Sequence, residues 1–111
     1  MVAQVRPTLL NDWLQAQSGA GVVLDVREPW ELQTASVTAE GFDLVAIPMG
    51  QITTRLGELD AARPVAVLCH HGARSQRVAM FLAQQGFGEV ANIAGGIEAW
   101  SQERDPTVPR Y

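Results

Sequence analysis

The apolar residues of this chain gather in short continuous runs, which are typical of strands buried on both faces of a sheet. Each run ends at or near a charged residue, a proline, a glycine or a polar loop. The pattern predicts strands at residues 22–26, 44–47, 65–68 and 90–93, and a shorter strand at residues 2–5.

Between these runs, apolar residues recur at intervals of three and four, the pattern of helices with one buried face. Pro7 and Pro29 each suit the first turn of a helix. Residues 34–43 are polar and small and predict a loop, whereas two prolines make residues 105–111 an extended surface tail. Helices are expected from Pro7 through Leu14, from Pro29 through Leu32, over residues 52–59 and 75–85, and from Ile97 onward.

Strands and helices alternate along all 111 residues. This alternation predicts an α/β fold, with a mostly parallel sheet of about five strands and helices on both faces. The length suits one domain, residues 1–111, whose apolar core needs no disulfide or metal. In open parallel sheets, ligands bind beyond the carboxyl ends of the strands. Asp25 and Arg27 end one predicted strand and Cys69 ends another, so we expect a site at that edge.

Composition narrows the classes of function. The formal net charge of −4 argues against a general nucleic-acid binder, which would need a basic face. No apolar run approaches the ~20 residues of a membrane helix, and the first seven residues lack the apolar core of a signal peptide. A single cysteine cannot form an internal disulfide. We therefore expect a cytoplasmic domain without nucleic-acid or membrane partners.

The one cysteine stands where a predicted strand gives way to a predicted helix, in the segment Cys69-His70-His71-Gly72-Ala73-Arg74-Ser75. The thiolate is the reactive form of cysteine, and a free thiol has a pKa near ~8.5. A helix N-terminus and inward-facing backbone amides stabilise an anion at such a place. Glycine at the fourth position allows the turn this requires. The position favours a nucleophile over the buried structural cysteine that is more common.

This segment resembles the active-site loop of rhodanese-type sulfurtransferases, C-x-x-G-x-R-S/T. Residues 24–31, Leu-Asp-Val-Arg-Glu-Pro-Trp-Glu, resemble the LDVREPxE motif of single-domain members. Residues 87–100 are similar to their G(F/Y)xxVxxxxGGxxxW ending. The motifs cover nearly the whole chain in the order of the family. At residues 36–41 the chain departs from the family's frequent H-I-P-G-A segment, so we expect a reshaped loop there.

The resemblance implies a reaction. Cys69 would attack the outer sulfur of a donor such as thiosulfate, release sulfite and carry a persulfide, a reversible state of cysteine. Cyanide or a thiol would then take the outer sulfur, in a displacement akin to thiol–disulfide exchange. No cofactor and no metal is expected. The partners would be a small anionic sulfur donor and a thiol or cyanide acceptor, and a sulfur-relay protein could serve as partner.

The resemblance also implies roles for the loop. The backbone amides following Cys69 would cradle the sulfur and the oxygens of the donor. Arg74 would bind the anionic donor or pair with an acid, and Ser75 would cap the helix and could also reach the sulfur. The substrate-binding residues expected on this basis are His70, His71, Gly72, Ala73, Arg74 and Ser75.

Two further expectations concern the surroundings of the loop. His70 and His71 would line the mouth of the site or lie in solvent. Asp25 and Arg27 are expected to brace the loop through an ion pair or hydrogen bonds rather than to touch the substrate.

The sequence leaves other readings open. Cysteine-dependent phosphatases and arsenate reductases use a C-x5-R loop, but only four residues separate Cys69 from Arg74. A structural zinc needs four placed ligands, and a thioredoxin-type site needs a second cysteine. A non-catalytic or sulfur-relay binding module is the main alternative to an enzyme. Exposed aromatics among Trp13, Trp30 and Trp100 could serve such an interface, although helical spacing favours a core position for the first and last.

Overall fold

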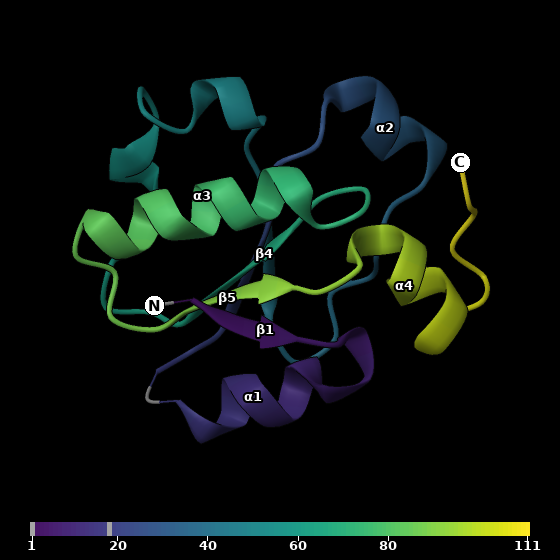
Figure 1. The fold of residues 1–111 in the computed structure, drawn as a ribbon, viewed down its shortest axis with the longest axis horizontal. Coiled ribbons are helices and arrows are strands. Elements are labelled where there is room, and N and C mark those ends of the chain that lie inside the picture. The colour runs from purple at the N-terminus through teal and green to yellow at the C-terminus, as the bar shows by residue number, and fades with distance from the viewer. Residues whose placement is uncertain (1, 18) are drawn as a thin grey trace.

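The computed structural model describes residues 2–17 and 19–111, and it contains one five-stranded sheet (Figure 1). The strand order is β1-β5-β4-β2-β3, and every neighbouring pair is parallel. The predicted α/β fold with a parallel sheet is therefore confirmed. The strands are β1 (Ala3–Val5), β2 (Val22–Asp25), β3 (Asp43–Ala46), β4 (Val65–Leu68) and β5 (Val90–Ile93). The α-helices are α1 (Leu10–Ala16), α2 (Pro29–Thr34), α3 (Ala73–Gln84) and α4 (Gly96–Glu103), with 3-10 turns at Pro7–Leu9, Met49–Gln51 and Leu56–Glu58.

The three central strands, β2, β4 and β5, are buried along their whole length, and their successive side chains point to opposite faces of the sheet. On β4, Ala66 and Leu68 face the core beneath α1 and α4, whereas Val65 and Val67 face the core beneath α3. This alternation explains why the strands are continuous apolar runs. Cys69 follows the same alternation and joins the α3 core.

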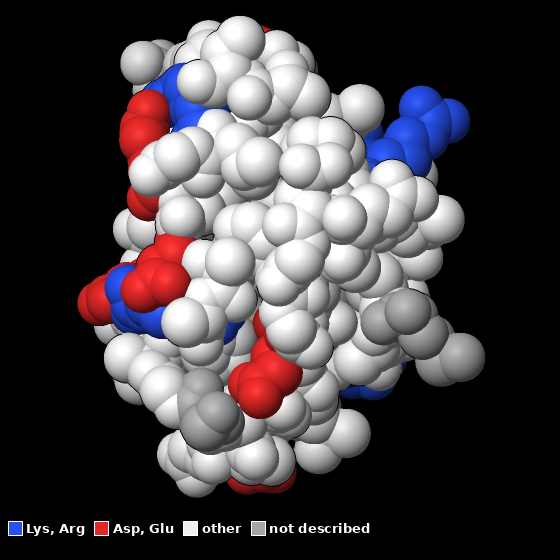
Figure 2. Space-filling view, turned by 90° about the vertical axis from the view of Figure 1, so that its left-hand side faces the viewer, with Lys and Arg blue, Asp and Glu red and all other residues white. Residues whose placement is uncertain are grey.

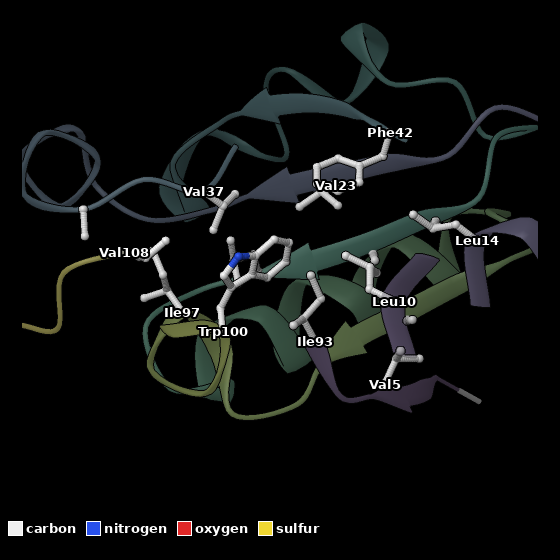
Figure 3. Close-up of a cluster of buried hydrophobic side chains, with 14 residues drawn as sticks. Val5, Leu10, Leu14, Val23, Val37, Phe42, Ile93, Ile97, Trp100 and Val108 are labelled. Atoms are coloured by element: carbon white, nitrogen blue, oxygen red, sulfur yellow. The ribbon is translucent and has the colours of Figure 1, made fainter. Parts of the chain in front are cut away.

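Trp100 is the largest fully buried side chain and the centre of the α1–α4 core (Figure 3). Its ring meets Phe42 edge-on, with the centroids 6.2 Å apart. Val37 and Val108 also pack in this cluster. Residues 35–42 lack regular structure, as predicted, but they contribute to the core. The tail after α4 is likewise non-helical, yet Val108 anchors it in the interior rather than leaving it on the surface.

The helix expected over residues 52–59 is wrong. Two separate 3-10 turns, Met49–Gln51 and Leu56–Glu58, flank an irregular turn instead. Of the three apolar residues that suggested the helix, only Ile52 is buried. The β-branched pair Thr53 and Thr54 and the glycine at position 57 lower helix propensity in this stretch, and its burial is too slight to compensate.

The carboxyl ends of the strands meet the β4–α3 loop, α2, the start of α4 and the C-terminal tail at the right-hand end of Figure 1. The opposite end, where the strands begin, faces the viewer in Figure 2, and its acidic and basic side chains form small separate groups. Within the described residues, no helix has the length and apolar character required to cross a membrane.

Candidate active site

Cys69 follows directly after β4 and lies in front of α3. It is 1% exposed. The backbone amide of Gly72 donates to its sulfur at 3.0 Å, and the Ser75 hydroxyl lies 3.2 Å from the same atom. The predicted contact between Ser75 and the sulfur is thus present. Among the described residues, Gly72 is the one backbone donor to Sγ, so the broad amide cradle expected from residues 70–75 is not formed in this state.

Ser75 is not the helix cap that we expected. The N-cap of α3 is Gly72, with φ of 107°, and Ser75 lies inside the first turn of the helix. A left-handed conformation of this kind favours glycine. It turns the Gly72 amide toward the sulfur, while Ser75, fully buried, reaches back to Cys69 from the helix. Ala73 begins the helix.

The start of α4 holds the other side of the loop. The amide of Ile97 donates to the carbonyl oxygen of Cys69 at 2.9 Å, and the amide of Glu98 donates to that of His70 at 3.2 Å. Gly96 makes this approach possible, because a Cβ there would lie 2.4 Å from the His70 oxygen. The Gly95-Gly96 pair was visible in the sequence, but its contact with the cysteine loop depends on the pairing of β4 with β5.

Asn92 on β5 is a site residue that the sequence reasoning missed. It is 4% exposed, and its Oδ1 accepts a hydrogen bond from the Ser75 hydroxyl at 2.5 Å. Its Nδ2 donates to the carbonyl oxygen of Gly72 at 3.3 Å and to Oε1 of Gln4 at 2.9 Å. The sequence did contain one indication of this role, a polar residue in the middle of an apolar strand. A buried side-chain amide needs hydrogen-bond partners, which such a position must provide.

Arg74 pairs with an acid, one of its two expected roles. Its two terminal nitrogens bind both carboxylate oxygens of Glu31 on α2, at 2.7 and 2.9 Å. The hydrogen bond from Arg74 holds the pKa of Glu31 at about 2, well below the usual 4.5, although burial opposes this shift. Arg74 remains 35% exposed and the Glu31 side chain 4% exposed. The Arg74 side chain is therefore partly open to solvent, while a buried carboxylate balances its charge.

Asp25 and Arg27 form a buried ion pair at the carboxyl end of β2, as predicted. The side chain of Arg27 donates to both oxygens of Asp25, the shortest contact being 2.7 Å, and neither residue is more than 1% exposed. Burial lowers the pKa of Arg27, but hydrogen bonds to Asp25 and Tyr111 outweigh it and leave that pKa above its ordinary value.

Tyr111 joins this ion pair to the loop and was not anticipated as a site residue. Its hydroxyl accepts from Arg27 at 3.1 Å and donates to Glu31 at 2.6 Å. Its ring stacks on His70 with the centroids 3.9 Å apart. The C-terminal tail thereby forms one wall of the site.

His70 lies between two rings, because His71 stacks on its other face at 3.9 Å. His71 is exposed and His70 is half-buried, with Nε2 of His70 buried and without a hydrogen-bond partner. Ligand atoms of both histidines and of Glu98 lie within 4.8 Å of one another. This group offers three ligand atoms, one fewer than a structural zinc site needs.

Comparison with known proteins agrees with this architecture. The rhodanese-like domain family matches residues 10–103. A sulfurtransferase of Allochromatium vinosum is 36% identical over 87 residues, which cover 78% of each chain. The putative sulfur carrier protein YrkF of Bacillus subtilis is 34% identical over 79 residues, 71% of this chain and 40% of that longer protein.

Solved structures show the same likeness. A rhodanese-related protein from Thermoplasma volcanium superposes with a TM-score of 0.78 at 30% identity, covering 98% of this chain and 99% of the other. The family match covers strands β2 to β5, the four α-helices α1 to α4 and the cysteine loop. The chain belongs to the rhodanese-like domain family, a family of sulfur transfer.

Proposed function

We propose that the protein transfers sulfane sulfur through a persulfide on Cys69. The Cys69 thiolate attacks the outer sulfur of thiosulfate or a related persulfide donor. The donor's sulfur–sulfur bond breaks, and its electron pair leaves with sulfite or with the donor thiolate. Cyanide or a thiol then attacks the outer sulfur of the Cys69 persulfide, and the Cys69 thiolate is the leaving group. The reduced thiol that this chemistry needs suits a cytoplasmic location.

One observation carries this proposal: the cysteine sulfur lies at the start of α3, in contact with the Gly72 amide and the Ser75 hydroxyl. The Gly72 amide donates to the sulfur, the Ser75 hydroxyl can donate or accept, and neither group is a general base. Sulfite and thiolates leave as anions, so displacement at sulfur needs anion stabilisation rather than a proton donor. A hydrolase that transfers acyl groups would need a base beside its nucleophile.

The burial of Cys69 constrains the donor. At 1% exposure, the thiol is reached only when side chains or backbone of the loop shift. A small donor with a terminal sulfur atom would reach the thiol with a smaller opening of the loop than a larger donor would need. We propose that Arg74 and the two histidines attract the anionic donor at the mouth. The Arg74 side chain is 35% exposed although it binds Glu31.

The experiment is persulfide formation measured by intact mass spectrometry. Purified protein mixed with thiosulfate should gain the mass of one sulfur atom, and the subsequent addition of cyanide should remove it. The Cys69→Ala variant should gain nothing, since the chain has no other cysteine. An unmodified wild type, or an equal gain in the variant, would overturn the proposal.

A sulfur-relay role is the second candidate, because one relative is named a putative sulfur carrier protein. Trp30, 62% exposed, stands edge-on to Tyr111 beside the mouth and offers a contact for a protein partner. A relay domain would take sulfur from a persulfidated donor protein faster than from thiosulfate. Comparing the two loading rates on the same preparation separates relay from thiosulfate:cyanide transfer.

A phosphatase or arsenate reductase is not supported, because Arg74 is tied to Glu31 on the neighbouring helix rather than turned over the sulfur. Turnover of an aryl phosphate at a rate similar to that of thiosulfate would reverse this preference.

A further inference from the structure

The Ser75 hydroxyl has one hydrogen, and its direction is fixed by Asn92. The carbonyl oxygen of Gly72 can only accept, so the atom of Asn92 that faces it at 3.3 Å must be the amide nitrogen. The other atom, Oδ1, then faces Ser75 and must accept from it at 2.5 Å. The only hydrogen of Ser75 is thus directed to Asn92.

This assignment determines the state of the sulfur. Toward Cys69, 3.2 Å away, the Ser75 oxygen presents lone pairs alone. The thiol must therefore donate its own hydrogen to Ser75, while the Gly72 amide donates to the sulfur. A thiolate or persulfide in the same place would face the lone pairs of Ser75 unless the hydroxyl rotated toward it. Rotation would leave Oδ1 of Asn92 without a donor in the interior, which is costly.

We propose that Asn92 is a positioning residue that controls the ionisation of Cys69 by competing with the sulfur for the Ser75 hydrogen. With the sulfur as a thiol, the hydrogen goes to Asn92; with the sulfur as a thiolate or persulfide, it goes to the sulfur. This inference deepens the proposed function, and the use of a tuned thiolate rests on that function. Its evidence, however, comes from hydrogen-bond geometry around Cys69, Ser75 and Asn92, each of which is less than 5% exposed.

The test is the rate of iodoacetamide alkylation against pH, followed on the single cysteine. Replacing Asn92 by leucine keeps the volume but removes the competing acceptor. In Asn92→Leu, the pH of half-maximal alkylation should fall by about 0.5 to 1 unit, the equivalent of one hydrogen bond. In the Ser75→Ala background, the same replacement should cause no fall, because no hydroxyl remains to be released.

The double-mutant comparison removes other influences on the sulfur. Loss of the Asn92 contact with Gly72 occurs in both backgrounds and cancels. The charged and titratable groups bordering the loop stay constant: Arg74 with Glu31, His70 and His71, Tyr111 of the tail, the Asp25–Arg27 pair on β2, and Glu98 on α4. Ser101→Ala, which removes another buried hydroxyl far along α4, is the matched control and should leave the midpoint unchanged.

An unchanged or raised midpoint in Asn92→Leu overturns the proposal, as does a fall that persists without Ser75. Should Asn92→Leu fail to fold, infrared spectroscopy of the unmodified protein decides. The one S–H stretching band in mildly acidic solution should lie at lower frequency in wild type than in Ser75→Ala, and equal frequencies would refute donation to Ser75. Neither measurement involves a sulfur donor, so its outcome is independent of whether the protein transfers sulfur.

Discussion

At the scale of single residues, the site depends on buried polar groups that satisfy one another. The sequence indicated the nucleophile, because a lone cysteine between an apolar run and a glycine-containing turn is distinctive. It also indicated the Asp25–Arg27 pair. It could not indicate the partners of Arg74 and Ser75, since Glu31 and Asn92 are distant in sequence and reach them only through the order of the strands.

Glu31 provides a prediction about acid stability. Because Arg74 holds its pKa at about 2 against the usual 4.5, its charged form stabilises the folded state. That contribution is complete above pH 4.5 and is lost as the pH falls toward 2. Glu31→Gln should lower the free energy of unfolding at neutral pH by at most about 3 kcal/mol. The difference from wild type should shrink across this acid range in urea titrations.

Glu58→Gln is the matched control. Glu58 makes a similar two-point pair with Arg55, but it is exposed on the surface. Solvent screens such pairs, so little stability should be lost. Equal losses in the two variants, or a Glu31→Gln deficit that persists unchanged at the acid end, would contradict the role given to the buried pair.

At the scale of elements, the strands were predictable and the irregular segments were not. Apolar runs located all five strands within a residue or two. For β2, β4 and β5 the reason is complete burial, which leaves little choice of residue type. The interval of Ile52, Leu56 and Leu59 indicated a helix that does not form, because spacing alone cannot show which of the three residues finds a core. The contributions of Val37 and Val108 to the core could not be predicted, because a single apolar residue in a polar segment shows no periodicity.

The junction between α4 and the cysteine loop gives a prediction at this scale. In Gly96→Ala, the new Cβ would meet the carbonyl oxygens of His70 and Cys69 at 2.4 and 2.5 Å, at a backbone φ of 60°. The variant should lose more than about 1 kcal/mol of unfolding free energy. Persulfide loading should slow as well, because the loop must shift to relieve the overlap.

Gly50→Ala serves as its control, since a Cβ there meets nothing within 4 Å. Its stability should remain within about 0.5 kcal/mol of wild type in the same urea titration. A Gly96→Ala protein as stable as this control would show that the loop and α4 are less tightly joined than the structure indicates.

At the scale of the whole molecule, two cores share one sheet. Trp100 belongs to the core beneath α1 and α4, and Cys69 to the core beneath α3. The strands β2, β4 and β5 each contribute side chains to both, so neither core can be lost while the centre of the sheet remains. The active-site loop is therefore supported from both faces at once.

Cooperative unfolding follows from this arrangement. Tryptophan emission and the accessibility of Cys69 to a thiol reagent should change at the same urea concentration, as expected of a two-state domain. Emission should be measured in a Trp30→Phe background, because that exposed side chain reports solvent in either state. Exposure of the thiol well before the change in emission would indicate that α3 and its core open separately.

The solitary thiol has a consequence for how long a loaded molecule survives. Sulfur-transfer proteins with two neighbouring cysteines can release the outer sulfur without an external acceptor. The second thiol attacks the persulfide and forms a disulfide. With one cysteine, this chain has no such internal exit. The outer sulfur of the persulfide would leave only by attack of an external acceptor, and the 1% exposure of Cys69 limits the access of such acceptors. The lifetime of the persulfide should then be set by the concentration and reactivity of the acceptor.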